Sequence, residues 1–342
     1  MTSPRLSLFF FGADARADAP AQYRTLLEAA RLADDAGYAA VWVPERHFQR
    51  YGGLYANPSV TAAALAVTTR RIGIRAGSVV LPIQNPIRVA EEWAMVDNLS
   101  GGRVGMAIAT GWHVDDFVLS PGSYADRGVD VAQKLAVLQR LWRGEQVTLP
   151  NGAGVAVPVT SLPRPIQPEL PLWLTTSTDA GFQRAGTLGH GVLTANFTHG
   201  HDPRALAQRI ALYRRACGQA EVSGVTLMVH AFVGGSDAVA EIARPAMRRY
   251  ITASLEAQRA LGTARAHPLE PRHDPFLDHL VELQAGANLE GALSFVGTLD
   301  RCREQARAFA ALGVAEVACL VDFDVSADHL LRTVRALAEL AG

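Results

Sequence analysis

The chain has 342 residues, of which 49% are hydrophobic and 19% charged, and its formal net charge is −1 at pH 7. This composition is typical of a large packed core, and the near-zero charge argues against nucleic acid or an anionic membrane as a partner. Three cysteines without a CxxC pair argue against a disulfide framework and a thiolate metal site. Neither a signal peptide nor an apolar run of about 18 residues is found, so we expect a cytoplasmic protein.

Eight short apolar runs predict β-strands. They are continuous rather than alternating, which is typical of strands covered on both faces. In chain order they span residues 6–11, 40–44, 72–80, 103–109, 172–176, 191–195, 226–233 and 316–321.

Amphipathic segments that predict helices follow most of these runs. The first ends before Gly37, a residue typical of the position after a helix C-terminus. The helices are predicted at residues 21–36, 58–69, 87–99, 129–143, 180–188, 203–216, 238–261, 299–312 and 327–340. Eight alternating units indicate an α/β fold, a single (β/α)₈ TIM barrel over residues 1–342. An open dinucleotide-binding sheet would carry a glycine fingerprint after its first strand, and Phe11-Gly12-Ala13-Asp14 does not.

Three segments interrupt the repeat. Residues 144–168 contain several Pro and Gly residues and predict an inserted hairpin with an extended arm. Residues 262–290 carry charged and His-containing stretches and predict a lid or an irregular excursion. Residues 110–127 form a long loop after the fourth strand. Loops that follow barrel strands lie on the catalytic face, so we expect the last two segments to shape a substrate pocket.

The second strand ends in a polar cluster, Glu45-Arg46-His47, with Asn57 shortly after it. These side chains could bind a polar ring or move a proton near neutral pH. Alternatively, Arg46 and Glu45 form an ion pair and His47 is merely hydrogen-bonded.

The third and fourth strands also end in sequences suited to a flat ligand. Gly77-Ser78 lets the backbone approach a ring closely, or else forms a bulge at a barrel corner. Thr110, Trp112 and His113 follow the fourth strand and could lie beside such a ring. The adjacent Asp115 and Asp116 have no partner spacing for a metal, so a solvated loop is expected there.

The fifth strand opens directly into a helix through Thr176, Ser177 and Thr178. Hydroxyls and free amides at a helix N-terminus bind anions, so a phosphate is the natural ligand. Simple capping by Ser177 or Thr178 is the compatible alternative. Conventional nucleotide, serine-hydrolase and zinc-protease motifs are absent. His199-Gly200-His201-Asp202 could hold a metal, but solvated turn histidines are the simpler interpretation, and we expect no metal site.

Together these segments resemble the bacterial luciferase-like monooxygenases, from the first strand to Phe323. The similarity rests on PERHF with YGGL and NPSV, on VVLPIQNPIRVAEEWAMVDNLSGGRVGMAIATGW, on PLWLTTS followed by AGFxxAG, and on FVGTLDRC. GWHVDDFVLSPGSYADR resembles the branch found with nonribosomal peptide and polyketide assembly lines. The resemblance implies a homodimeric barrel that uses reduced FMN from a separate flavin reductase. Its substrate would be a small molecule, free or bound to a carrier protein, and both hydroxylation and Baeyer–Villiger insertion stay open.

The resemblance also implies residue roles. Gly77–Ser78 matches a cis peptide under the isoalloxazine ring. The phosphate site is matched by Thr176, Ser177, Gly181, Phe182 and Arg127, and Asn57 joins the cofactor-binding candidates.

Two positions depart from luciferase. Thr110 stands where luciferase has a phosphate-contacting arginine, which implies a missing or weaker contact. Arg46 stands where luciferase has its catalytic histidine, so His47 is expected to orient flavin or substrate. Arg46, His47 and His113 are the catalytic candidates. The alternatives are an F420-dependent oxidoreductase of the same fold, a flavin-binding protein without turnover, and an unrelated barrel hydrolase or isomerase.

Overall fold

Eight parallel strands close into a barrel in the computed structural model, which describes residues 3–12, 18–49, 51–218, 223–262 and 275–341. Each strand pairs with its neighbours in the order β11, β1, β2, β3, β4, β7, β8 and β9, and β9 pairs back onto β11. The strands are β1 (Arg5–Phe9), β2 (Ala40–Val43), β3 (Gly73–Val80), β4 (Val104–Ala109), β7 (Leu172–Thr175), β8 (Gly191–Ala195), β9 (Val225–Val233) and β11 (Glu316–Leu320). The predicted TIM barrel is therefore confirmed.

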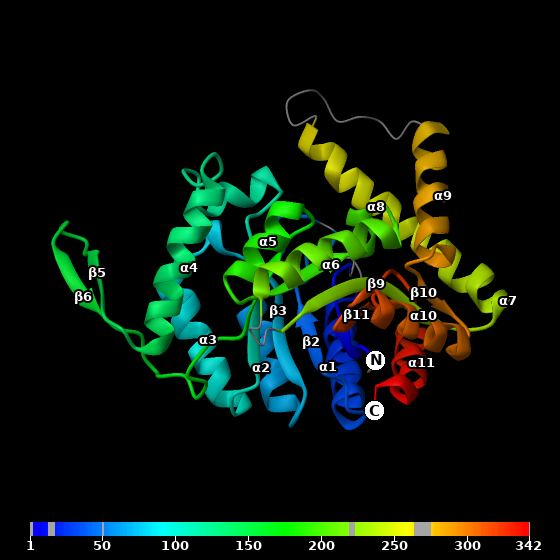
Figure 1. Ribbon diagram of the computed structural model, residues 1–342, viewed down its shortest axis with the longest axis horizontal. Helices are drawn as coiled ribbons and strands as arrows, with labels where there is room; N and C mark the ends of the chain where they lie inside the picture. Colours follow the sequence, from blue (N-terminus) through cyan, green and yellow to red (C-terminus); the bar gives the residue numbers. More distant parts are fainter. Residues whose placement is uncertain (1–2, 13–17, 50, 219–222, 263–274, 342) are drawn as a thin grey trace.

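Helices surround this barrel (Figure 1). They include α1 (Ala19–Asp35), α2 (Pro58–Thr68), α3 (Pro86–Ser100), α4 (Arg127–Arg143), α5 (Asp179–Thr187), α6 (Pro203–Cys217), α10 (Leu299–Leu312) and α11 (Ala327–Leu337). Four of them begin with a Pro in the first turn behind an Asp or Asn cap, a combination that presets the first helical φ and satisfies a free amide. Among the described residues, no helix is both long and apolar enough to cross a membrane.

One of the predicted irregular segments is confirmed, and a second differs from expectation. Residues 144–168 contain the predicted hairpin, β5 (Val147–Pro150) with β6 (Ala156–Val159), which projects away from the barrel in Figure 1. Residues 262–290, predicted to form a lid or an irregular excursion, end in a regular helix, α9 (Pro275–Glu290). The start of that segment, residues 263–274, lies outside the described residues. The irregular alternative is wrong for α9, because charged residues obscured the spacing of Val281, Ala285 and Leu289, which the helix buries on one side.

The single helix predicted at residues 238–261 is divided. It consists of α7 (Ser236–Ala238), a π-helical segment (Val239–Ala243) and α8 (Arg244–Gly262). A short strand that was not predicted, β10 (Phe295–Gly297), pairs with the end of β9. Helices α8 and α9 contact one another and stand together in Figure 1.

The barrel interior holds a charged pair among aromatic rings. Glu316 at the start of β11 accepts hydrogen bonds from Arg75 at 2.8 and 2.9 Å and from Trp42 Nε1 at 3.0 Å. The Arg75 guanidinium also lies 4.9 Å from the Trp42 ring centre and 4.5 Å from that of Trp173. This layer fills the barrel near the amino ends of the strands. Open space is left toward their carboxyl ends.

Candidate active site

A cavity of about 900 Å³ lies at the carboxyl ends of the barrel strands. Residues that follow β1, β2, β4, β7 and β8 line it, and Gly77, Ser78 and Val80 of β3 and Met228 and His230 of β9 join them. Helices α8 and α9 supply a further wall that includes Tyr250, Leu283 and Asn288. The location is the catalytic face of (β/α)₈ enzymes, and the volume is near the upper end of the range of about 300–1,000 Å³ for ligand pockets.

The N-terminus of α5 opens onto this cavity. Thr178 caps the helix by accepting a hydrogen bond from the Gly181 amide at 3.1 Å, and Thr176 Oγ1 accepts one from the Thr178 amide at 3.3 Å. Thr176 and Ser177 line the cavity. A Cβ on Gly181 would lie 1.9 Å from Thr176 Oγ1, so the close packing here requires glycine. Of the two predicted caps, Thr178 is confirmed, and Ser177 stays available to a ligand.

Strand β3 ends in the predicted cis peptide between Gly77 and Ser78. The register between β3 and β4 also shifts at this point, so the bulge that was the alternative is present as well. Ser78 Oγ lies 2.5 Å from Thr175 Oγ1 of β7, across the intervening strand β4. Hydroxyl groups therefore connect the wall near Ser78 with the N-terminus of α5.

Glu45 organises the end of β2. Its buried carboxylate accepts hydrogen bonds from the Val80 amide at 2.7 Å and from the Gln84 side chain, and it lies 3.1 Å from His47 Nε2. The expected pair between Glu45 and Arg46 is not observed, because Glu45 already has these other partners. Glu45 and Arg46 line the cavity, whereas His47 is not among the lining residues.

Arg46 faces the cavity from a cage of aromatic rings. Its guanidinium carbon lies 4.1 Å from the ring centre of Phe11, 4.8 Å from that of Tyr51 and 5.8 Å from that of Trp112. Arg46 is 7% exposed, and its Nη1 atom is buried without a hydrogen-bond partner. A fixed positive charge therefore stands at the cavity wall.

The loop after β4 is less solvated than expected. Thr110 and Trp112 line the cavity, whereas His113 and Asp116 are buried with Nδ1 and Oδ1 3.5 Å apart. Burial raises the pKa of Asp116, and the nearby His113 opposes that shift. Asp116 therefore corrects the prediction of a solvated loop, while Asp115 is exposed.

Sequence reasoning missed His230 on β9. The His230 ring lines the cavity wall, 5.0 Å from the Tyr250 ring and 5.5 Å from the Phe323 ring, and its Nδ1 lies 3.1 Å from Asn288 Oδ1. Asn288 Nδ2 donates to the Gln284 carbonyl, so Oδ1 must accept from His230 Nδ1. Burial lowers the pKa of His230 to about 4, which leaves the ring neutral at pH 7. A lone histidine inside an apolar strand run was the signal for this residue.

Asp322, just after β11, was missed as well. Its carboxylate accepts hydrogen bonds from the Phe11 amide at 2.8 and 2.9 Å, from the Gly12 amide at 3.2 Å and from the Tyr55 hydroxyl at 3.2 Å. Burial raises its pKa to about 6, although these donors act in the opposite direction. Asp322 therefore holds the ring of Phe11 in place beneath Arg46.

The structure brings together only part of the predicted set. Six predicted residues line the cavity: Arg46, Gly77, Ser78, Thr110, Thr176 and Ser177. Six do not: His47, Asn57, His113, Arg127, Gly181 and Phe182. Asn57 caps α2, Phe182 is fully buried, and Arg127 stacks on the Tyr124 ring at 4.4 Å. Direct contacts of these six with a ligand stay predictions.

The histidine turn after β8 is more buried than predicted. His199 is buried, with Nε2 2.8 Å from Thr194 Oγ1, and it also contacts Arg209, so the prediction of a solvated turn is wrong for this residue. Burial lowers the pKa of His199 to about 4, and the Arg209 charge adds to the effect. In the described part of the chain, no three His, Cys, Asp or Glu side chains are grouped as metal ligands.

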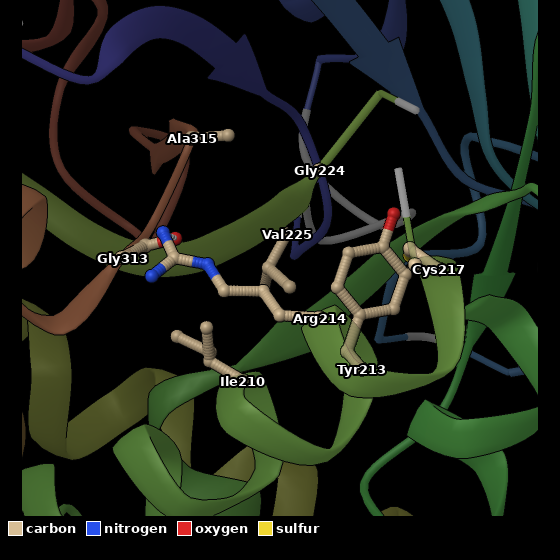
Figure 2. Close-up of a pocket in the computed structure, with 9 residues that line it drawn as sticks. Ile210, Tyr213, Arg214, Cys217, Gly224, Val225, Gly313 and Ala315 are labelled. Carbon is tan, nitrogen blue, oxygen red and sulfur yellow. Dashed lines mark hydrogen bonds between the residues drawn. The ribbon is translucent and has the colours of Figure 1, made fainter. Parts of the chain in front are cut away.

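A smaller cavity of about 340 Å³ lies at the opposite end of β9. Figure 2 shows Arg214 extended across it toward Gly313, whose carbonyl accepts a hydrogen bond from Nη2 at 3.4 Å. Tyr213 and Cys217 border the same space, and burial raises the pKa of Tyr213. This end of the barrel carries the turns that precede the strands, so we assign it to stability.

A closed parallel barrel with charged groups buried around a cavity at its catalytic face defines a (β/α)₈ enzyme. A family model described as luciferase-like monooxygenase matches residues 5–316. The chain belongs to this family and is a flavin-dependent monooxygenase. The oxygenase component of the flavin-dependent trigonelline monooxygenase of Acinetobacter baylyi is 25% identical over 317 residues, which cover 89% of this chain and 84% of that protein.

Solved structures share the fold. The monooxygenase RslO1 from Streptomyces bottropensis superposes with a TM-score of 0.76 at 24% identity, with 98% of each chain covered. The oxygenating constituent of 3,6-diketocamphane monooxygenase from Pseudomonas putida, in complex with FMN, gives 0.71 at 17% identity, covering 98% of this chain and 97% of that one. An F420-dependent secondary alcohol dehydrogenase gives 0.72 at 17% identity, with coverages of 99% and 98%. Likeness at these identities shows the architecture, which serves both cofactors.

Proposed function

We propose that the protein is the oxygenase component of a two-component system that receives reduced FMN from a separate flavin reductase and oxygenates a small organic substrate. The observation that carries the proposal is a single cavity lined by both Ser78 and the helix-start pair Thr176 and Ser177. The trigonelline relative is itself named as an oxygenase component, which supports a separate reductase.

The residues present fit a mononucleotide. Thr176 and Ser177 offer hydroxyls at the N-terminus of α5, where backbone amides and the helix dipole favour a phosphate. From there the hydroxyl contact between Thr175 and Ser78 leads to the wall where the family resemblance locates the ring. The Arg127 guanidinium stacks on the Tyr124 ring, and Arg127 does not line the cavity. Its contact with the phosphate therefore stays a prediction.

FMN fits the charge of the cavity better than F420 does. Among the described lining residues, Arg46 is the only Lys or Arg. The longer anionic tail of F420 would require more basic groups at the mouth, whereas one phosphate is served by a helix N-terminus.

Reduced FMN, when bound, supplies the two electrons with which one atom of O₂ enters the substrate and the other leaves as water. The chain's own residues bind, orient and exclude water. Phe11 and Trp112 cover the wall near Arg46, and Glu45 holds His47 and the Val80 amide. We assign His47 and His113 positioning roles, because neither lines the cavity.

Anaerobic titration with reduced FMN and with reduced F420 tests the cofactor. We expect tight binding of reduced FMN and weak binding of reduced F420, and the reverse order would overturn the proposal. Addition of ¹⁸O₂ to the loaded enzyme with free or carrier-bound substrates should yield a product with one labelled oxygen. Flavin binding without a labelled product would favour a storage protein. The purified chain should not oxidise NADPH rapidly by itself, because rapid oxidation would contradict a separate reductase.

A further inference from the structure

The barrel contains two guanidinium groups that are stacked on aromatic rings, and they differ in one respect. Arg75 lies between Trp42 and Trp173 and has the Glu316 carboxylate at 2.8 Å. Arg46 lies among Phe11, Tyr51 and Trp112, but no described Asp or Glu oxygen is within ion-pair distance of its guanidinium. Buried charges in folded proteins are normally paired, so within the described part of the chain Arg46 lacks the anion that Arg75 has.

The nearby acidic groups are committed to other partners. Glu45 accepts from the Val80 amide and Gln84, and Asp322 accepts from the Phe11 amide and the Tyr55 hydroxyl. Asp116 faces His113. Neither Glu45 nor Asp322 can neutralise Arg46 without breaking an existing hydrogen bond. The Arg46 charge lowers the pKa of Asp116, but no ion pair joins the two side chains.

The Arg46 side chain is also held in position before any ligand arrives. Gly52 has a φ of +74°, and a Cβ on it would lie 2.3 Å from Arg46 Cδ, so the chain passes directly over the arginine stem. The Arg46 amide donates to the Tyr55 carbonyl at 2.9 Å. Tyr55 and Phe11 are themselves fixed by Asp322. Such preorganisation lowers the entropy cost of binding an anion.

We propose that Arg46 binds a carboxylate of the substrate. The inference rests on the proposed function, since it names the substrate class for the same cavity. A planar guanidinium fork matches the two oxygens of a carboxylate, and the surrounding rings accommodate an apolar body. The flavin phosphate is assigned to the N-terminus of α5 after β7, and strands β3 and β4 separate that site from β2. The substrate class is therefore an apolar or aromatic carboxylic acid.

Calorimetric titration with 2-naphthoate and its uncharged analogue 2-naphthamide tests the proposal on the flavin-free protein and on the protein loaded with oxidised FMN. Charge-assisted hydrogen bonds to a buried guanidinium predict a preference for naphthoate of about 10- to 100-fold in the wild type. Arg46→Met should abolish that preference, because it should weaken naphthoate binding far more than naphthamide binding. Arg46→Lys should retain part of it. Arg332→Met is the matched control, because it removes an exposed arginine on α11 whose ion pair is with the neighbouring Asp328.

Each outcome of these titrations either supports or overturns the assignment of Arg46 to a substrate carboxylate. Equal binding of the two probes by the wild type overturns the proposal, even if Arg46→Met fails to fold. A naphthoate preference that survives in Arg46→Met, or falls equally in Arg332→Met, also overturns it. So does an Arg46→Met variant that loses FMN affinity alone, since Arg46 would then serve the flavin. If naphthoate selectivity depends on Arg46 but FMN does not bind, the carboxylate site stands and the proposed function fails.

Discussion

Glu316 offers a severe test of how the barrel interior is stabilised. Its side chain is fully buried, and it joins Arg75 of β3 and Trp42 of β2 to the start of β11. The perturbation is Glu316→Gln, which retains the shape and one carbonyl acceptor but removes the charge. Arg75, whose side chain is 12% exposed, then keeps its charge without a counterion.

The expected cost is about 3 kcal/mol, the lower end of the range of roughly 3–5 kcal/mol for breaking a buried ion pair, because the amide oxygen still accepts one hydrogen bond. Arg5 also lies 3.5 Å from Glu316, but its side chain is 56% exposed. Solvent screening limits that pair to at most about 1 kcal/mol. With an m-value of about 3 kcal/mol per M, the urea midpoint should fall by about 1 M.

The stability difference between wild type and Glu316→Gln should also depend on pH, in a direction set by the pKa of Glu316. Burial alone would raise the pKa of Glu316, but the Arg75 guanidinium holds the net pKa below the ordinary value. The ion pair therefore stabilises the fold above the unfolded-state pKa of about 4.3, and this contribution is lost as pH falls through the lower folded-state pKa. The difference between wild type and Glu316→Gln should accordingly shrink in acid.

A double variant distinguishes the lost pair from simple strain. Arg75→Met with Glu316→Leu removes both charges, and replacing a buried pair by apolar residues is often close to neutral. We therefore expect the double variant to be more stable than Glu316→Gln alone. A cost below about 1 kcal/mol for Glu316→Gln would refute this reasoning. So would strictly additive costs of Arg75→Met and Glu316→Leu when each single variant is compared with the double variant.

Three further predictions concern the cavity. In ¹⁵N NMR at pH 7, His230 should be neutral with its proton on Nδ1 and should titrate near pH 4, so a charged ring at pH 6 would contradict the assignment. Gly181→Ala should weaken FMN binding at least about tenfold, because the added Cβ would displace Thr176. Flavin fluorescence measures this binding. Gly128→Ala serves as the control, since a Cβ there meets nothing within 4 Å. Asp322 has a folded pKa of about 6, above the unfolded value of about 3.9, so wild type should gain about 2–3 kcal/mol over Asp322→Asn as pH falls from 7 to 4. A flat difference in urea midpoint over that range would argue against a buried, proton-binding Asp322.

The barrel was predictable because each strand is a continuous apolar run covered on both faces, and that pattern survives in the sequence without knowledge of its neighbours. The Gly77–Ser78 cis peptide was predictable only through the family resemblance, since the residues alone allow an ordinary bulge. Arg46 illustrates the limit of local reasoning. Adjacency suggested a pair with Glu45, yet the strand end directs Glu45 toward Val80 and Gln84 and Arg46 toward the rings.

The residues that were missed lie where distant segments meet. The hydrogen-bond partner of His230 is Asn288, which is 58 positions away. Asp322 accepts a hydrogen bond from Phe11, which is 311 positions away. Neither relation leaves a local spacing that a sequence pattern can reveal. The strand containing His230 was predicted correctly, but the partner that fixes its tautomer lies on α9, the segment predicted to be irregular.

The cavity has two facing walls that are built from different elements. The wall assigned to flavin is built from the ends of β3 and β7, whose positions are set by strand pairing and change little without disturbing the barrel. The facing wall includes β9, directly opposite β3 in the ring of eight strands, together with α8 and α9. Side chains on α8 and α9 can be exchanged without altering strand register, so selectivity for the apolar body of the substrate should reside there. Arg46 follows β2 and belongs to neither α8 nor α9, which predicts that changes on α9 alter the shape of acid accepted while leaving the requirement for a carboxylate intact.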